Sequence, residues 1–170
     1  MTETPDNTLE QIISDLLPDL VRYVRKCTMS VHDTEDIVQE ALLSGYKALK
    51  EGTEPVSIRA WIFTIVHNQM INYHRKKGTI STMVEKLKSS MPQTSEHLSK
   101  EIDAELIANK VNSLPPTARE TIILRYYHGF SYEEIADIMS VSVGTIKQQI
   151  FRSLKFLREQ ISHFDKGEKI

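Results

Sequence analysis

A group of cationic, amide and aromatic side chains near the end of the chain has the chemistry of a DNA-reading surface. Residues 141–158 hold four bases and no acid. With helical spacing, one side of this stretch presents Lys147, Gln148, Phe151, Arg152 and Lys155. In the major groove Arg binds guanine through two hydrogen bonds, Gln binds adenine, and an apolar ring contacts the thymine methyl. The start of the same helix, near Ser142 and Thr145, suits a phosphate.

A purely structural explanation competes with this one. Amphipathic helices usually pack against a core while their charged side is solvated. Phe151 is an aromatic ring on the polar side, and no acid accompanies the bases around it. These two features favour DNA contact over simple packing.

The elements that must hold these side chains form a helix-turn-helix pattern. Ser131 with Glu134 three residues later is a capping box, which predicts a short helix over about 132–139. After a three-residue turn, Ser142 can cap a long last helix to about residue 161. Small Ala136 allows the two helices to approach closely. The apolar residues expected to fill the angle or form the buried stripe are Ile135, Met139, Val141, Val143, Ile146, Ile150, Leu154, Leu157 and Ile161.

A second candidate surface lies in the middle of the chain. Asn72, Tyr73, His74, Arg75, Lys76 and Lys77 make a basic helix end with an aromatic ring, and Asn68 and Gln69 precede it. Aromatic stacking combined with cations suits the capture of single-stranded DNA. A basic helix end also stabilises the helix dipole, so spacing alone leaves both interpretations open.

Helical periodicity dominates the rest of the sequence, which predicts an all-α protein of two small helical domains joined by a flexible linker. Apolar spacing predicts a helix over 9–27 with a kink or a division into two short helices at Pro18. Asp33 is the expected N-cap of the next helix, Ser57 that of a third, and Gly78 its end. Pro116 is expected in the first turn of a later helix. The domains expected are 1–78 and 101–170, with the Ser-, Thr- and Lys-rich stretch 79–100 as linker.

The charge distribution agrees with two separate contacts. The whole chain has a net charge of −2, but residues 1–57 sum to −6 and residues 58–78 to +4. Local basic patches attract a phosphate backbone whatever the total charge. The single cysteine, Cys27, permits no intramolecular disulfide, and no membrane span or secretory signal is recognisable. A cytoplasmic location is therefore expected.

Three segments in order resemble extracytoplasmic-function sigma factors of bacterial RNA polymerase. They are DTEDIVQEALLSGYKAL (33–49), IRAWIFTIVHNQMINYHRKK (58–77) and a stretch within 111–158 that contains LPPTARETIILRYYHGFSYEEIADIMSVSVGTIK. The resemblance implies a factor that directs promoter-specific transcription initiation. Its expected partners are promoter DNA, the clamp helices and flap of core RNA polymerase, and an anti-sigma factor. It implies no cofactor, no small-molecule substrate, and a monomer when free.

The resemblance also implies residue roles. Asp36, Gln39 and Glu40 look like contacts to the polymerase clamp. Asn68 matches the pocket for a flipped −10 base, together with loop 51–57, while Asn72, Tyr73, Arg75 and Lys76 belong to the same −10 surface. Lys147, Gln148, Phe151 and Arg152 match positions that face −35 bases, and Tyr132 and Thr145 match phosphate contacts. Asn72, His74, Ser140 and the pair Gln148-Gln149 depart from the family pattern.

Two other classes of function are less consistent with the sequence. His67 and His74 share a helix face, but no metal-ligand spacing, nucleophile–base set or Gly-rich phosphate loop accompanies them, so no enzyme is expected. A dimeric helix-turn-helix regulator would leave the segment 33–49 without a purpose. An elongated monomer in solution would favour the sigma factor, and a dimer the regulator.

Overall fold

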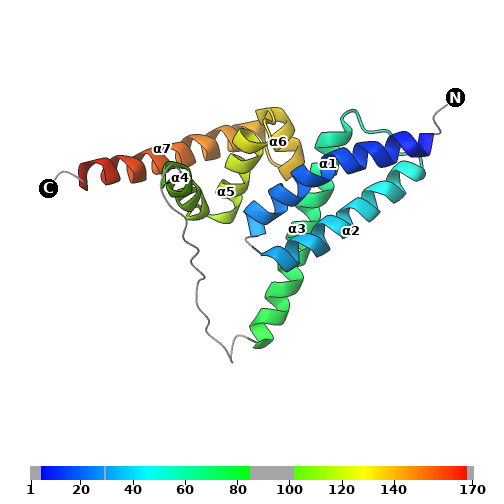
Figure 1. Ribbon diagram of the computed structural model, residues 1–170, viewed down its shortest axis with the longest axis horizontal. Coiled ribbons are helices and arrows are strands. Elements are labelled where there is room, and N and C mark those ends of the chain that lie inside the picture. Colours follow the sequence, from blue (N-terminus) through cyan, green and yellow to red (C-terminus); the bar gives the residue numbers. More distant parts are fainter. Residues whose placement is uncertain (1–4, 29, 85–101, 168–170) are drawn as a thin grey trace.

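Helices form nearly all of the described structure, a computed structural model that covers residues 5–28, 30–84 and 102–167. In chain order they are α1 (Pro5–Thr28), α2 (Val31–Lys50), α3 (Ile58–Val84), α4 (Ile102–Asn112), α5 (Pro116–Ile122), the π-helical turn η1 (Ile123–Tyr127), α6 (Tyr132–Met139) and α7 (Val143–Gly167) (Figure 1). Within those residues there is no strand, which confirms the all-α class. None of these helices is long and apolar enough to cross a bilayer.

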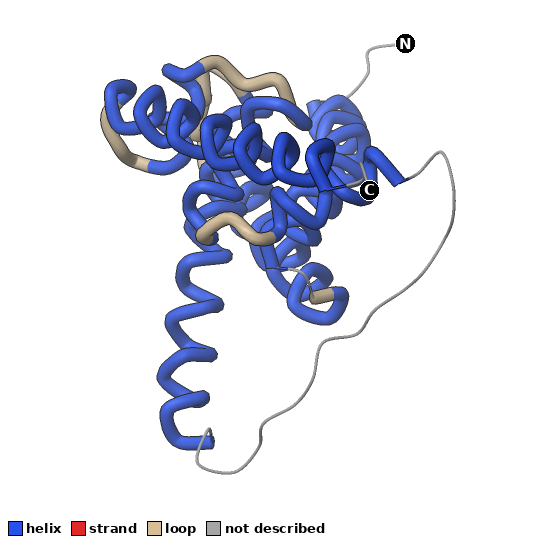
Figure 2. The backbone as a smooth tube through the Cα atoms, turned by 90° about the vertical axis from the view of Figure 1, so that its left-hand side faces the viewer, coloured by secondary structure: helices blue, strands red, loops and turns tan. Residues whose placement is uncertain are grey.

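Helices α1, α2 and α3 pack as a three-helix unit. The α2–α3 contact is close because Gly45 has no side chain: a Cβ there would lie 2.7 Å from Cδ1 of Ile62. The C-terminal part of α3 extends beyond this unit and projects away from the body of the molecule (Figure 2). The basic residues Arg75, Lys76 and Lys77 lie where α3 leaves this unit, and Lys77 still contacts Asp33 of α2.

Two predicted features of this unit are wrong, and at Pro18 one of the two predicted alternatives, the division into two helices, is excluded. The N-cap of α2 is Ser30, whose Oγ accepts a hydrogen bond from the Asp33 amide at 3.3 Å, and this leaves the Asp33 carboxylate free for a contact with α3. Helix α1 runs through Pro18 without dividing into two, because the missing amide costs one hydrogen bond while the helix buries Leu20 and Tyr23 on one side. Gly78 does not end α3, since an internal glycine weakens a helix by only about 1 kcal/mol.

The expected linker 79–100 is thus helical as far as Val84, and its remainder lies outside the described residues. The prediction that Ser57 caps α3 is confirmed by its hydrogen bond from the Ala60 amide at 3.3 Å. Pro116 occupies the first turn of α5 as predicted.

The helix-turn-helix agrees closely with its sequence signals. Ser131 and Glu134 form the capping box in both directions, with N–O distances of 3.1 and 2.8 Å. Helix α6 ends at Met139, and the capping residue Ser140 has a left-handed backbone (φ 55°, ψ 44°). The Oγ of Ser142 accepts from the Thr145 amide at 3.1 Å and caps α7, which continues to Gly167, six residues beyond the predicted end.

The chain between α5 and α6 contains a π-helical turn that the sequence did not reveal. The amide of His128 donates to the Ile123 carbonyl five residues back, at 3.2 Å. Gly129 then takes a positive φ of 71°, and the Phe130 amide donates to the Leu124 carbonyl at 3.1 Å. This turn brings His128 and Phe130 toward α1 and α3.

One hydrophobic core joins the two halves of the chain. It runs from Leu20, Val24 and Phe63 in the first half to Leu124 and Ile146 in the second. Helix α6 packs on α3, and α1 packs on η1 and α5 (Figure 1). The elongated free chain expected from a flexible linker is therefore not the arrangement that this structure has.

His128 is buried at this junction. Its ring meets Phe63 and Tyr23 with centroids 5.1 and 5.8 Å apart. Burial lowers the pKa of His128 to about 4, so the ring is neutral near pH 7. A neutral ring packs between the two aromatic side chains without an unpaired charge.

The strained cap of α6 gives a stability prediction. A residue with a side chain is disfavoured in the left-handed conformation, whereas glycine adopts it freely. Ser140→Gly should therefore stabilise the protein by about 0.5–1 kcal/mol, measured by urea unfolding. Ser142→Gly, at a capping position with ordinary backbone, is the matched control and should destabilise. A loss of stability in Ser140→Gly would show that the Ser140 side chain contributes more than its backbone strain costs.

Candidate nucleic-acid interface

The exposed side of α7 carries the predicted base-reading residues together. Thr145, Lys147, Gln148, Arg152 and Lys155 are all exposed, and the Phe151 ring is 69% exposed. The opposite side of the helix is buried through Ile146, Ile150 and Leu157. This face therefore offers three long cations, an amide and an apolar ring to a partner without any change in the core.

Tyr132 connects this face to the start of α6. Its half-buried ring lies under the guanidinium of Arg125 at 4.7 Å and near the ammonium of Lys147 at 5.9 Å. Arg125 is itself fixed by a hydrogen bond to the Phe130 carbonyl at 2.8 Å. Cation–π contacts of this kind hold the ring in place. Tyr132 and Lys147 consequently lie side by side, as a phosphate contact requires.

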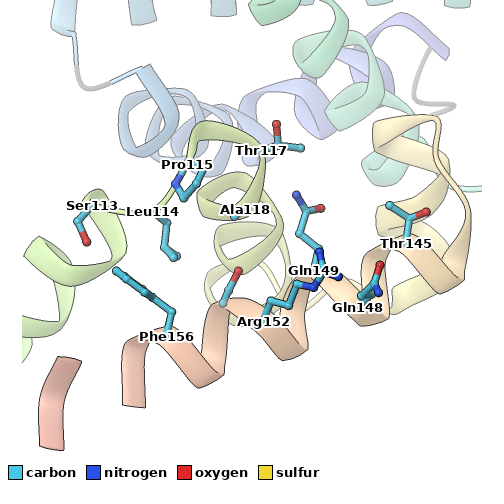
Figure 3. A pocket seen from close by; sticks show the side chains of 11 residues that line it. Ser113, Leu114, Pro115, Thr117, Ala118, Thr145, Gln148, Gln149, Arg152 and Phe156 are labelled. Carbon is cyan, nitrogen blue, oxygen red and sulfur yellow. The ribbon is translucent and has the colours of Figure 1, made fainter. Parts of the chain in front are cut away.

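A groove of about 610 Å³ runs beside the same face, between α7 and the turn that precedes α5. Figure 3 shows Gln148, Gln149 and Arg152 of α7 along one side of it and Pro115, Thr117 and Ala118 on the other. The side-chain Oε1 of Gln149 accepts a hydrogen bond from the Thr121 hydroxyl at 3.1 Å.

Gln149 and Phe156 line this groove although the sequence analysis assigned them no contact. The four-residue spacing of Gln148, Arg152 and Phe156 was the available signal, because residues four apart share a helix face.

The predicted −10 residues are brought to one helix end, but they do not share one environment. Asn68, Arg75 and Lys76 are exposed. Asn72 is half-buried, and its side-chain Oδ1 accepts a hydrogen bond from the Arg75 guanidinium at 3.1 Å. Tyr73 packs partly on the core and its hydroxyl donates to Asp33 at 2.9 Å. Tyr73 could therefore stack on a DNA base only with its ring held by the hydrogen bond to Asp33, or after that bond is broken.

Asp33 is the link between α2 and the basic end of α3. Its carboxylate accepts hydrogen bonds from Tyr73 and from Lys77, the latter at 2.8 Å. Partial burial raises the pKa of Asp33, but the bonds from Lys77 and Tyr73 outweigh it and hold the pKa below its usual value. This ionised carboxylate fixes the direction in which the end of α3 projects.

A separate acidic surface lies on α2. Asp36, Gln39 and Glu40 are exposed, whereas Ile37, Val38 and Ala41 between them are buried. Leu43 follows on the same side and is 56% exposed, a position that the sequence analysis did not single out. The seven-residue interval from Asp36 to Leu43, two helical turns, was the signal for it.

Metal chemistry finds no support within the residues that the structure describes, where no group of three or more His, Cys, Asp or Glu side chains could hold an ion. His67 is buried and pairs with Glu120 at 2.7 Å, and His74 is exposed on the far end of α3. Burial, more than the nearby Glu120, raises the pKa of the Cys27 thiol, which disfavours its reactive thiolate form.

Comparison with known proteins matches both halves of the chain to one family. Residues 12–80 match Sigma-70 region 2, and residues 104–157 match Sigma-70, region 4. The chain is 30% identical over 161 residues to the ECF RNA polymerase sigma-E factor of Escherichia coli K12, with 84% of each protein covered. It is 26% identical over 163 residues to the RNA polymerase sigma factor SigV of Bacillus subtilis, with 96% of each covered.

Two solved structures share the fold. The sigma factor RpoE of Bartonella quintana, in complex with the anti-sigma factor NepR, superposes with a TM-score of 0.76 at 26% identity, over 90% of this chain and 96% of that one. CnrH, in complex with the cytosolic domain of CnrY, gives a TM-score of 0.65 at 21% identity, over 93% and 90%.

The class of protein is defined by these matches together with the capped helix-turn-helix in one half and the three-helix unit in the other. The chain belongs to the sigma-70 family of RNA polymerase sigma factors, in its extracytoplasmic-function group. Members of this class direct promoter-specific transcription initiation with RNA polymerase, and that is the function of this chain.

Proposed function

We propose that α7 reads the −35 element as duplex, that α3 with loop 51–57 reads and opens the −10 element, and that α2 docks on the clamp helices of core polymerase. The exposed, acid-free face of α7 over residues 143–158 carries the proposal, since the opposite side of the helix packs on α5 and α6. Lys147, Gln148, Phe151 and Arg152 contact bases, while Tyr132, Thr145 and Lys155 hold phosphates. Asn68, Asn72, Tyr73, Arg75 and Lys76 form the −10 surface, and Asp36, Gln39 and Glu40 the docking surface.

The proposal also covers the organisation and setting of the chain. Its functional units are 1–78 and 101–170, with 79–100 between them. The factor acts in the cytoplasm as a monomer until it meets polymerase, and it catalyses no reaction of its own. The free energy of binding, and no nucleotide hydrolysis, opens the −10 region. An anti-sigma factor binds it, as NepR and CnrY bind the structural neighbours.

Run-off transcription tests the proposal directly. Purified bacterial core polymerase, a pool of genomic fragments and this protein should give discrete transcripts that core polymerase alone does not make. Their start sites would deliver the −35 and −10 sequences. If no transcripts appear and core polymerase fails to bind the protein, the assignment of α2, α3 and α7 is refuted.

Arg152 should contribute to base reading. Arg152→Ala is expected to cost about 1–3 kcal/mol of binding free energy on the cognate −35 duplex, and much less on a scrambled duplex, because a base contact is sequence-specific. Arg158→Ala removes an equal charge from an exposed position further along α7 and serves as control. Fluorescence anisotropy at two salt concentrations measures both. An equal loss on the two duplexes would make Arg152 a phosphate contact.

Asp36 and Gln39 should matter for polymerase and not for folding. Replacing both with Ala is expected to weaken binding to core polymerase by about 1–3 kcal/mol while leaving the circular dichroism spectrum unchanged, because both side chains are exposed. The pair Glu133→Ala and Asp137→Ala, two exposed acids of α6, is the control. If the α2 variant binds core polymerase at full strength, Asp36 and Gln39 are not part of the docking surface.

A further inference from the structure

A cavity of about 440 Å³ lies where the end of α1 and the start of α2 meet α4 and the π-helical turn η1. It shares no lining residue with the groove beside α7 or with the surfaces proposed to bind DNA or polymerase. Pockets of about 300–1,000 Å³ are the usual size of small-molecule sites. The cavity is therefore a candidate ligand site separate from those already described.

Contacts across the cavity hold its walls in place. The Arg119 guanidinium of α5 donates to the Cys27 carbonyl of α1 at 3.4 Å and to the Asn112 carbonyl of α4 at 2.8 Å. The Lys26 ammonium lies over the Tyr127 ring, 4.0 Å from its centroid. These contacts tie α1 to α4 and to η1, so the protein itself positions the walls and little ordering is needed to bind a ligand.

The α1 wall of the cavity is cationic. Arg25 and Lys26 in the last turn of α1 both line it, and none of the described residues around it is acidic. Val31 is the first residue of α2, so the positive end of that helix dipole lies beside the same cavity. Basic residues also suit the C-terminal end of α1, but that role requires no cavity around them. Two cations and a helix N-terminus together favour an anion such as a phosphate.

The α4 and η1 walls suit a flat ring. Val111 and Ile123 are buried and give this part of the lining an apolar surface. The Tyr127 ring is 49% exposed although Lys26 lies over it, and exposed aromatic rings stack on nucleobases. Asn112 also lines the cavity, and an Asn amide both donates and accepts, as the edge of a purine requires. A phosphate joined to a planar, hydrogen-bonding ring is a nucleotide.

We propose that this cavity binds a purine mononucleotide, with the phosphate on Arg25 and Lys26 and the base against Tyr127 and Asn112. The site goes beyond the proposed function and does not rest on it. Because α1 supplies the cations while α4 and η1 supply the ring and the amide, the nucleotide contacts both halves of the chain at once. A ligand that binds only the folded chain stabilises it by mass action. Nucleotide supply thereby regulates how stable the free factor is.

Amide chemical shifts of the isotopically labelled full chain, followed during titration, test the site. Adenosine monophosphate and guanosine monophosphate are the probes, with adenosine and inorganic phosphate as the matching fragments. At least one mononucleotide should bind with a dissociation constant of about 10–100 µM, the range expected for a ligand of this size. It should shift amides within 25–28, 108–112 and 123–127, and each fragment should bind at least about 10-fold more weakly.

Variants separate the contributions of the walls. Arg25→Ala and Lys26→Ala should each weaken mononucleotide binding by about 10-fold or more, because each removes a charge-assisted contact. Arg158→Ala removes an equal charge from an exposed position on α7 and should leave binding unchanged. Tyr127→Leu should weaken binding of the mononucleotide but not of inorganic phosphate. Ala108→Phe places a large side chain in the cavity without altering a charge and should abolish binding.

Three results would overturn the site. The first is no saturable binding of either mononucleotide up to about 2 mM. The second is equal binding of inorganic phosphate, which would leave only a site for simple anions. The third is a set of shifts confined to α7, which would place the nucleotide on the DNA-reading surface. Circular dichroism checks each fold, and Arg25→Ala and Ala108→Phe act on different walls, so either can decide if the other loses helix. Run-off transcription tests the proposed function separately, because these titrations involve no polymerase.

Discussion

A carboxylate that is largely shielded from water needs hydrogen-bond donors, and Glu120 finds them in α1 and α3. This requirement fixes α5 against the first three helices. Once α5 is fixed, the π-helical turn carries His128 between Tyr23 and Phe63, and Arg59 reaches the His128 carbonyl. Helix α6 then packs on α3, and the orientation of α7 follows from its contact with α6. The direction of the DNA-reading face thus depends on a contact far from it.

The functional surfaces and the junction use different sides of the same helices. Helix α3 turns His67 inward to Glu120 and Asn68 outward to solvent. Helix α2 buries Ile37 and Val38 while it exposes Asp36 and Gln39. The surfaces proposed to bind partners are therefore exposed while the junction is formed.

Local signals in the sequence predicted the local structure well. The caps at Ser57, Ser131 and Ser142 depend on hydrogen bonds between residues three apart, so the sequence contains all that they need. The exposed face of α7 followed from helical periodicity for the same reason. Ser30, not Asp33, caps α2 because the Asp33 carboxylate is held instead by Tyr73 and Lys77, at positions 40 and 44 residues away.

Contacts between distant residues were beyond such reasoning. Tyr23 and Glu120 are 97 residues apart, and the spacing of residues within either helix does not predict that their side chains form a hydrogen bond. The same holds for the role of Tyr73, which spacing assigned to DNA and which the structure also ties to Asp33. Exposure of Leu43 depends on which side of α2 faces its neighbours, and only the packed helices decide that.

The π-helical turn has a consequence for comparing this protein with others. A π turn accommodates one more residue than an α turn, which rotates every later side chain by about 100° relative to an unbroken helix. Ile122 before the turn packs with Val111 and Leu157, whereas Ile123 and Leu124 within it join the core shared with α1 and α3. A homologue without the extra residue of the π turn would present the later side chains, and with them the surface that packs on α3, in a different direction. Deleting or inserting one residue within 123–127 would therefore change how the whole C-terminal half is oriented, even if every other residue were kept.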